Sequence, residues 1–245
     1  MKNVYLISGV IAVISLFSCK KGNDANPSTV SLPKTYTEDL RSVAISSLTT
    51  YNLSYDSKSR LISMTSIPEP SFLKFIYQYP TDNTVTLDMY NSGQLSIHEN
   101  FWLNSFSSLD STFQYDDSDD TTTEKYYYDG NHLLTEVNNY DYIGSVPTLT
   151  NQTQYTYDNT GDPLTQADYS GTTSFTYYSN LPYTLTIGQP YIKTPKYFIK
   201  TTTATSNGTP ATATHFYVFD SSNRLIQDSA NISGINAILV KTYTY

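Results

Sequence analysis

Four aspartates crowd into one short stretch of the chain: Asp116, Asp117, Asp119 and Asp120. Carboxylate oxygens on a loop are the ligands that Ca²⁺ prefers, so this stretch is a candidate calcium site. It lacks the glycine and the closing glutamate of an EF-hand loop. The alternative is a solvated, self-repelling turn that keeps a hairpin tip soluble. We favour the turn and expect no metal ion or cofactor.

Catalytic signatures are missing from the rest of the chain. There is no Gly-x-Ser-x-Gly, His-Glu-x-x-His, glycine-rich phosphate loop or Cys/His zinc spacing. The histidines, His98, His132 and His215, stand far apart in the sequence. Paired carboxylates for glycoside hydrolysis need only be neighbours in space, so a hydrolase stays open as an alternative. Glutamates are few, and we expect that the protein is not an enzyme.

Two aromatic residues are candidates for contact with a ligand. Trp102, the only tryptophan, is flanked by amide residues at positions 100 and 104, and such a ring suits stacking on a sugar. The alternative, which we favour, is that Phe101 or Trp102 fills the core. Tyr127 stands between two tyrosines, so in a strand it must face away from both of them and is expected to be exposed.

A repeated pattern predicts the elements that carry these residues. It reads aromatic or apolar, polar, aromatic, Asp, a few turn formers and then Leu. The Asp and the Leu are five residues apart in three of the clear copies and six apart in the other, and such near-constancy indicates a repeated structural unit. The clear copies are LSYDSKSRLI from Leu53, YYYDGNHLLT from Tyr126, YTYDNTGDPLT from Tyr155 and YVFDSSNRLIQ from Tyr217.

Each copy is predicted to be a β-hairpin. In the third copy Tyr155 and Tyr157 are two apart, so both rings share one face of a strand and Thr156 faces the other way. The aspartate then accepts a hydrogen bond from the backbone two residues on, the chain reverses, and Leu164 starts the return strand. The predicted turn formers are Asp56, Asp129, Asp158 and Asp220.

Degenerate copies extend the pattern along the chain, at 77–80 (YQYP), 113–120 (FQYDDSDD), 175–180 (FTYYSN) and 243–245 (YTY). Hairpins in series predict an all-β domain from 36 to 245, an antiparallel meander of roughly ten to sixteen strands. We expect it to form a curved sheet or partial barrel, because a single sheet needs its apolar face covered. Residues 37–45 fit a short helix or a first strand about equally well.

The chain begins with the pattern of a secretory signal. One basic residue precedes an apolar run shorter than the ~20 residues of a spanning helix. Leu16 lies three residues before Cys19 and Ser18 immediately before it, which resembles a bacterial lipobox. The resemblance implies cleavage between Ser18 and Cys19 and lipid attachment to the Cys19 thiol. Residues 1–18 are then the signal peptide and 19–35 a flexible tether.

The repeats resemble the YD repeat of RHS-type and teneurin-like proteins. They are also similar to a group of small Bacteroidetes lipoproteins of unknown function, the DUF4595-like group, and that resemblance implies a porin-like curved sheet. The net charge of −8 argues against a nucleic-acid partner. We expect a lipid-anchored envelope protein on the outer membrane. The sequence leaves both sides of that membrane, the periplasm and the cell surface, as alternatives. We expect the protein to act as a structural or interaction module, with another envelope protein as its partner. The alternative is that it binds a glycan for a polysaccharide-uptake system.

Overall fold

The structure is a computed structural model of the whole chain, and it describes residues 31–42, 46–67, 73–116, 121–143, 146–183, 195–206, 208–233 and 236–245. The signal and most of the tether, with Ser18 and Cys19, therefore lie outside the described residues. Residues 37–41 of the helix-or-strand segment belong to a strand, because they pair antiparallel with residues 46–50 on one side and 238–242 on the other.

The described residues form sixteen strands. They are β1 (Thr35–Arg41), β2 (Ser46–Tyr55), β3 (Leu61–Ile67), β4 (Leu73–Thr81), β5 (Thr84–Asn91), β6 (Gln94–Leu103), β7 (Leu109–Asp116), β8 (Thr121–Tyr128), β9 (Leu134–Ile143), β10 (Val146–Tyr157), β11 (Pro163–Asp168), β12 (Gly171–Pro182), β13 (Tyr197–Ser206), β14 (Thr209–Phe219), β15 (Leu225–Ile232) and β16 (Ala237–Thr244).

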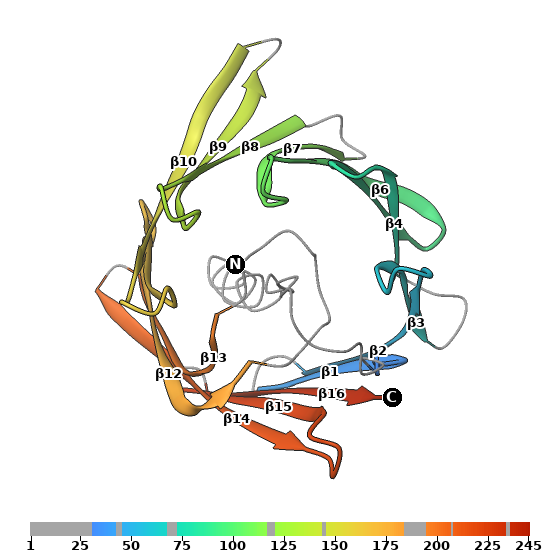
Figure 1. The fold of residues 1–245 in the computed structure, drawn as a ribbon, viewed down its shortest axis with the longest axis vertical. Coiled ribbons are helices and arrows are strands. Elements are labelled where there is room, and N and C mark those ends of the chain that lie inside the picture. Colours follow the sequence, from blue (N-terminus) through green and yellow to red (C-terminus); the bar gives the residue numbers. More distant parts are fainter. Residues whose placement is uncertain are drawn as a thin grey trace.

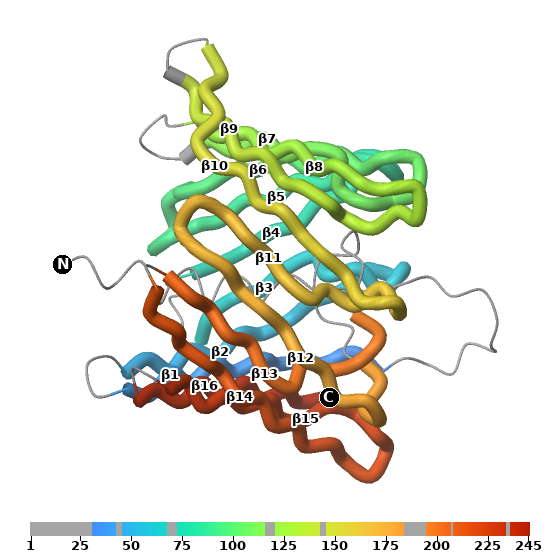
Figure 2. Tube along the Cα trace, turned by 90° about the vertical axis from the view of Figure 1, so that its left-hand side faces the viewer, coloured from blue at the N-terminus to red at the C-terminus, as the bar shows by residue number. Residues whose placement is uncertain are grey.

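The sheet closes on itself. Every strand pairs antiparallel with its neighbour in sequence, and β1 also pairs with β16, from Thr35 opposite Thr244 to Arg41 opposite Ile238. The expected curved sheet or partial barrel is thus corrected to a closed barrel of sixteen strands, seen end-on in Figure 1 and with its tilted strands in Figure 2. Closure is favourable because the first and last strands would otherwise leave two rows of unpaired backbone groups.

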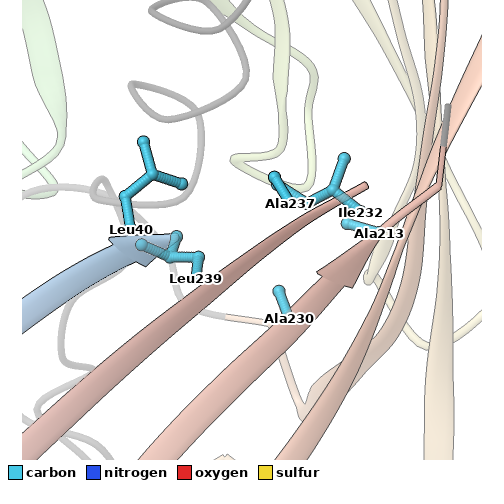
Figure 3. Close-up of a cluster of buried hydrophobic side chains, with 6 residues drawn as sticks. All are labelled: Leu40, Ala213, Ala230, Ile232, Ala237 and Leu239. Carbon is cyan, nitrogen blue, oxygen red and sulfur yellow. The ribbon is translucent and has the colours of Figure 1, made fainter. Parts of the chain in front are cut away.

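One face of the barrel wall is largely buried and carries the apolar clusters. Along β16 the buried side chains are Ala237, Leu239, Lys241 and Tyr243, every second residue. Figure 3 shows a cluster of this face, with Leu40 of β1 beside Leu239 on the side toward the barrel interior. Residues directly opposite one another in paired strands share a face. The pairing register of each strand with the next therefore identifies the inward-facing residues all around the barrel.

Three further clusters line the inner face. They are Tyr51, Leu53 and Leu61; Val85, Leu87, Phe101 and Leu109; and Phe198, Leu225 and Tyr243. Stacked and edge-on rings join them, as where Tyr36 lies 6.0 Å from Tyr51 and 5.6 Å from Tyr243 between ring centroids. The barrel is therefore held together from the inside by aromatic and aliphatic side chains.

The outer face is polar over much of the wall. Pairs of threonine hydroxyls on adjacent strands hydrogen-bond to each other across it. The pairs are Thr35 with Thr244 (2.6 Å), Thr37 with Thr50 (3.0 Å), Thr156 with Thr165 (2.7 Å), Thr176 with Thr201 (2.6 Å) and Thr203 with Thr212 (3.0 Å). Thr suits a strand because its branched side chain packs on the pleat, and its hydroxyl can hydrogen-bond to a partner on the neighbouring strand.

Candidate functional site

The repeat aspartates sit at hairpin turns on one end of the barrel. Oδ1 of Asp56 accepts hydrogen bonds from the backbone N–H groups of Lys58 and Arg60, both at 2.9 Å, and Oδ2 accepts one from Nε of Arg60 at 2.7 Å. Asp220 repeats these contacts with Ser222 and Arg224. Each carboxylate closes its own turn.

The other two copies make the same turn. Oδ1 of Asp129 accepts from the N–H groups of Asn131 and Leu133, and Oδ1 of Asp158 accepts from those of Thr160 and Asp162. The residue three after the aspartate has positive φ in all four copies: Ser59 (63°), His132 (61°), Gly161 (85°) and Asn223 (60°). His132 is thus a turn residue, and its ring lies 4.2 Å from that of Phe106.

The turn hydrogen bonds change the acidity of these carboxyl groups. For Asp56 and Asp158 partial burial raises the pKa, but the hydrogen bonds from backbone and side-chain donors outweigh it, and the pKa is lowered overall. For Asp220 the backbone hydrogen bond from Arg224 is the largest influence, and the pKa is again lowered. The bonds therefore favour the charged form of each aspartate.

The third copy corrects one detail of the expected hairpin. Tyr157 pairs with Pro163, where the other copies pair Tyr55 with Leu61 or Phe219 with Leu225. Pro163, not Leu164, therefore starts the return strand. Leu164 faces outward and is 41% exposed, because one extra step along a strand reverses the direction of the side chain.

A fifth turn of this type was not predicted. Oδ1 of Asn104 accepts hydrogen bonds from the N–H groups of Phe106 and Ser108, and Ser107 has a φ of 61°. Leu103 then pairs with Leu109, as the corresponding residues do in the other copies. The spacing of five residues from Asn104 to Leu109 was present in the sequence, but the copy was missed because it has Asn where the repeat pattern has Asp. An amide oxygen forms this turn as a carboxylate does.

Tyrosine hydroxyls connect several hairpins to the one before. Tyr128 and Tyr157 end β8 and β10, Tyr79 lies near the end of β4, and each donates a hydrogen bond to a backbone carbonyl on the preceding hairpin. Only Tyr55, in the first clear copy, has a buried hydroxyl with no partner among the described residues. The donor and acceptor pairs are Tyr79 and Leu61 (2.9 Å), Tyr128 and Leu109 (2.7 Å), Tyr157 and Leu134 (2.7 Å), Tyr177 and Pro163 (2.7 Å), Tyr217 and Ile199 (2.8 Å) and Tyr245 and Leu225 (3.0 Å).

The degenerate copy at 113–120 joins the antiparallel strands β7 and β8, as a hairpin does, but its aromatic pair does not take the inner face as the pairs of the clear copies do. Phe113 lies directly opposite Asn100 and Thr123, whose neighbours Phe101 and Glu124 occupy the inner face. Phe113 and Tyr115 therefore point outward. Their strand, β7, runs away from the turn end, so the aromatic pair precedes a connection at the other end of the barrel.

These rings belong to an outward-facing group on β6 to β9, which we call the aromatic face. Of the two residues of which one was expected to fill the core, Phe101 takes the core position, at 3% exposure, and Trp102 is 41% exposed on the opposite side. Tyr127 is 43% exposed and also faces outward. The aromatic face consists of His98, Trp102, Phe113, Tyr115, Tyr127, Tyr140 and Tyr142.

Neighbouring groups hold several of these rings in place. The imidazole of His98 stacks on Tyr115 with 4.9 Å between ring centroids, and its Nδ1 lies 2.5 Å from a carboxylate oxygen of Asp88. The ammonium of Lys125 lies 5.7 Å from the centre of the Tyr140 ring. Rings fixed in this way lose little freedom when they bind a ligand.

Behind the aromatic face, the inner face carries two glutamates. Glu99 of β6 and Glu124 of β8 flank Thr112 of β7, and the hydroxyl of Tyr126 donates to Glu124. Burial, reinforced by the charge of Glu124, raises the pKa of Glu99 to about 8, although a hydrogen bond with Thr112 opposes this. Glu99 is an uncharged acid over much of the neutral range.

A second polar group lies inside β13 to β16. The imidazole of His215 is 2% exposed, its Nδ1 lies 3.5 Å from a carboxylate oxygen of Asp228, and its Nε2 lies 3.4 Å from the hydroxyl of Thr202. Lys241 stands opposite both Asp228 and Glu38, and burial lowers its pKa against the pull of those two carboxylates.

A shallow groove of about 440 Å³ opens between β14, β15 and β16. Its lining includes Thr212, Thr214, Asn231 and Ile238, so it offers hydroxyl, amide and aliphatic groups. These groups form hydrogen bonds and apolar contacts but do not supply an acid or base.

No metal centre is found in the described part of the chain, where no three His, Cys, Asp or Glu side chains come close enough to hold an ion. The calcium candidate at 116–120 lies outside the described residues, apart from the backbone of Asp116. Across the same described ranges, no helix is long and apolar enough to span a membrane.

Comparison with known proteins relates the chain to others by its fold. No protein-family model and no curated protein matches the sequence. A porin-like protein from Bacteroides uniformis ATCC 8492 superposes with a TM-score of 0.62 at 15% identity, covering 89% of this chain and 99% of its own. A porin-like protein from Bacteroides vulgatus ATCC 8482 gives a TM-score of 0.61 at 11% identity, covering 88% and 98%. At these identities the likeness extends to the barrel fold.

Proposed function

We propose that this chain is a lipid-anchored, non-catalytic binding module of the bacterial envelope, whose barrel stands in water beside the membrane. The lipobox-like segment that ends at Cys19 supplies the anchor, and the closed barrel supplies a rigid scaffold. The porin-like fold of the structural neighbours is compatible with a place in the envelope.

One observation carries the proposal, namely the direction in which polar and apolar side chains point. A barrel that spans a membrane presents an apolar band to the lipid and a polar interior. Here the inner face holds the aromatic and aliphatic clusters, and the outer face holds threonine pairs. The outer face also carries charges, such as Asp39, Arg41, Lys74 and Lys125. Basic side chains at the middle of a bilayer each cost about 2 to 4 kcal/mol.

The position at which the chain enters the barrel is also consistent with a lipid anchor at Cys19. The N–H of Lys34 bonds to the carbonyl of Thr244, and Arg224 donates to the hydroxyl of Ser31 at 3.0 Å. Both contacts lie at the end of the barrel that carries the repeat turns. Ser31 is twelve positions after Cys19 in the sequence, a span of at most roughly 40 Å. We infer that the turn end is the one nearer to the membrane.

Removing the lipid while keeping export tests this function. The Cys19→Ser variant is made with a second change, in which the lipobox-like signal is exchanged for a secretory signal that is cleaved without lipid attachment. Fatty-acid labelling and membrane fractionation then compare the variant with wild type. We expect labelled, membrane-bound wild type and an unlabelled variant that is soluble and folded. Equal labelling of both proteins contradicts the anchor. A folded variant that stays in the membrane fraction and is not extracted from it by alkaline carbonate contradicts the proposal that the barrel stands in water.

A further inference from the structure

We propose that the aromatic face of β6 to β9 is a binding site for an uncharged glycan chain. The inference rests on the proposed function, because only a barrel with its outer wall in water presents these rings to a soluble ligand. Its first support is exposure: Trp102, Tyr115 and Tyr127 are 41%, 39% and 43% exposed on three adjacent strands. Large exposed apolar groups gathered in one place mark binding surfaces.

The pairing register gives the layout of the three rings. Trp102 stands opposite Ser111, and Ser111 stands opposite Lys125. Tyr115 is four residues beyond Ser111 toward one end, and Tyr127 is two residues beyond Lys125 toward the other. With a rise of about 3.3 Å per residue and about 4.8 Å between strands, Tyr115 and Tyr127 are roughly 20 Å apart, with Trp102 between them along the barrel axis. A ligand that meets all three must be an extended chain.

Polar side chains separate the rings. Asn100 and Thr123 flank Phe113, Ser111 and Lys125 share a row with Trp102, and Glu136 stands opposite Tyr127. A sugar unit offers an apolar face of C–H groups bordered by hydroxyls, so it stacks on a ring and bonds to the polar groups beside it. A protein partner favours a continuous apolar centre with a polar rim, which this alternation interrupts.

The charges around the aromatic face favour an uncharged glycan over an acidic one. Asp88, Asp110 and Glu136 lie on or beside it, with Asp88 held against His98. Lys125 is the ammonium group within the face, and it lies over Tyr140. An excess of carboxylates repels uronic acids and phosphates, and it leaves acceptors for sugar hydroxyls.

A matched control exists on the opposite side of the barrel. Phe216 of β14 is 47% exposed on the outer face, and its partner across the sheet is Ser229. It is an exposed aromatic ring on the same kind of wall, but its outer neighbours Val218 and Thr214 are not aromatic. Phe216→Ala therefore removes a ring without touching the aromatic face.

The test uses the mature lipoprotein in detergent micelles. Cellohexaose, laminarihexaose and mannohexaose are the uncharged probes, polygalacturonate is the acidic one, and binding is measured by calorimetry and by Trp102 fluorescence. We expect at least one uncharged hexasaccharide to bind. Trp102→Ala and Tyr115→Ala should each weaken that binding by about tenfold or more, since a few large aromatic rings carry most of the affinity of a site. Phe216→Ala should leave it unchanged.

Three outcomes overturn the proposal: no binding of any uncharged hexasaccharide, equal weakening by Phe216→Ala, or tighter binding of polygalacturonate. Circular dichroism of each variant confirms folding, and Tyr127→Ala replaces a variant that does not fold. Failure here leaves the fractionation result for Cys19→Ser untouched, so the glycan site and the proposed function are refuted by different measurements.

Discussion

The two faces of the barrel wall are formed by alternate residues of the same strands, and their side chains differ in burial and packing. On β16, Leu239 is 2% exposed and joins the inner cluster, and the adjacent Ile238 is 44% exposed on the outer face. On β14, Tyr217 packs against Phe198 with 4.4 Å between ring centroids, whereas Val218 is 45% exposed. The inner face therefore holds the packed clusters that stabilise the barrel, and side chains on the outer face, such as Ile238 and Val218, are not covered by the rest of the chain.

The sharpest test of this comparison is on β16. Leu239→Ala removes a buried side chain and leaves a cavity, and we expect a loss of about 3 kcal/mol in the free energy of unfolding. Ile238→Ala should change that free energy by no more than about 0.5 kcal/mol. Urea unfolding of both variants measures the difference, and equal losses would contradict the assignment of the faces.

The second test uses the buried acid of the inner face. The pKa of Glu99 rises from 4.5 to about 8 on folding. Its contribution to stability is therefore complete below pH 4.5 and is lost as the pH rises toward 8. Glu99→Gln cannot ionise, so the variant should gain stability relative to wild type as the pH rises through this window. Urea midpoints at several pH values measure this gain, and a constant difference between the two proteins would rule out the buried acid.

A smaller effect is expected from the tyrosine hydroxyls. Tyr157→Phe removes the donor to the carbonyl of Leu134 and should cost about 1 kcal/mol. Tyr55→Phe is the control, because its buried hydroxyl has no partner among the described residues, and the change should be neutral or stabilising. Thermal unfolding distinguishes the two, and the hydroxyl-to-carbonyl account fails if Tyr55→Phe costs as much as Tyr157→Phe.

An effect of similar size is expected at the turns. Asp158→Ala removes the acceptor for two backbone N–H groups and should cost about 1 kcal/mol. Asp158→Asn should be nearly neutral, since Asn104 forms the same turn in the native chain. If Asn destabilises as much as Ala in urea unfolding, the charge at position 158 has a role beyond the turn.

Local structure was predictable from the repeat. The alternation of Tyr155, Thr156 and Tyr157 and the aspartate after it specify a strand end and a turn, and the structure places them there. The same pattern misled at 113–115, because aromatic residues two apart share a face without specifying which face. The direction is set by the neighbouring strands, and here Phe101 and Thr112 occupy the inner positions.

The closure of the barrel and the aromatic face were not predictable in this way. Closure depends on Thr35 meeting Thr244 across almost the whole chain, and neither segment carries a local sign of that pairing. The aromatic face gathers Trp102, Tyr115 and Tyr127 from three strands, so it exists only once their register is known. A lone tryptophan beside a phenylalanine did not reveal which of the two is buried.

The most direct measurement of the central claim uses the native tryptophan. Trp102 lies on the outer wall, so its fluorescence reports what surrounds the barrel. The lipidated protein is placed on vesicles whose acyl chains carry bromine, which quenches tryptophan on contact. If the barrel stands in water, acrylamide quenches Trp102 and the brominated lipid does not. Strong quenching by the brominated lipid, with protection from acrylamide, would place the wall in the bilayer and contradict the account.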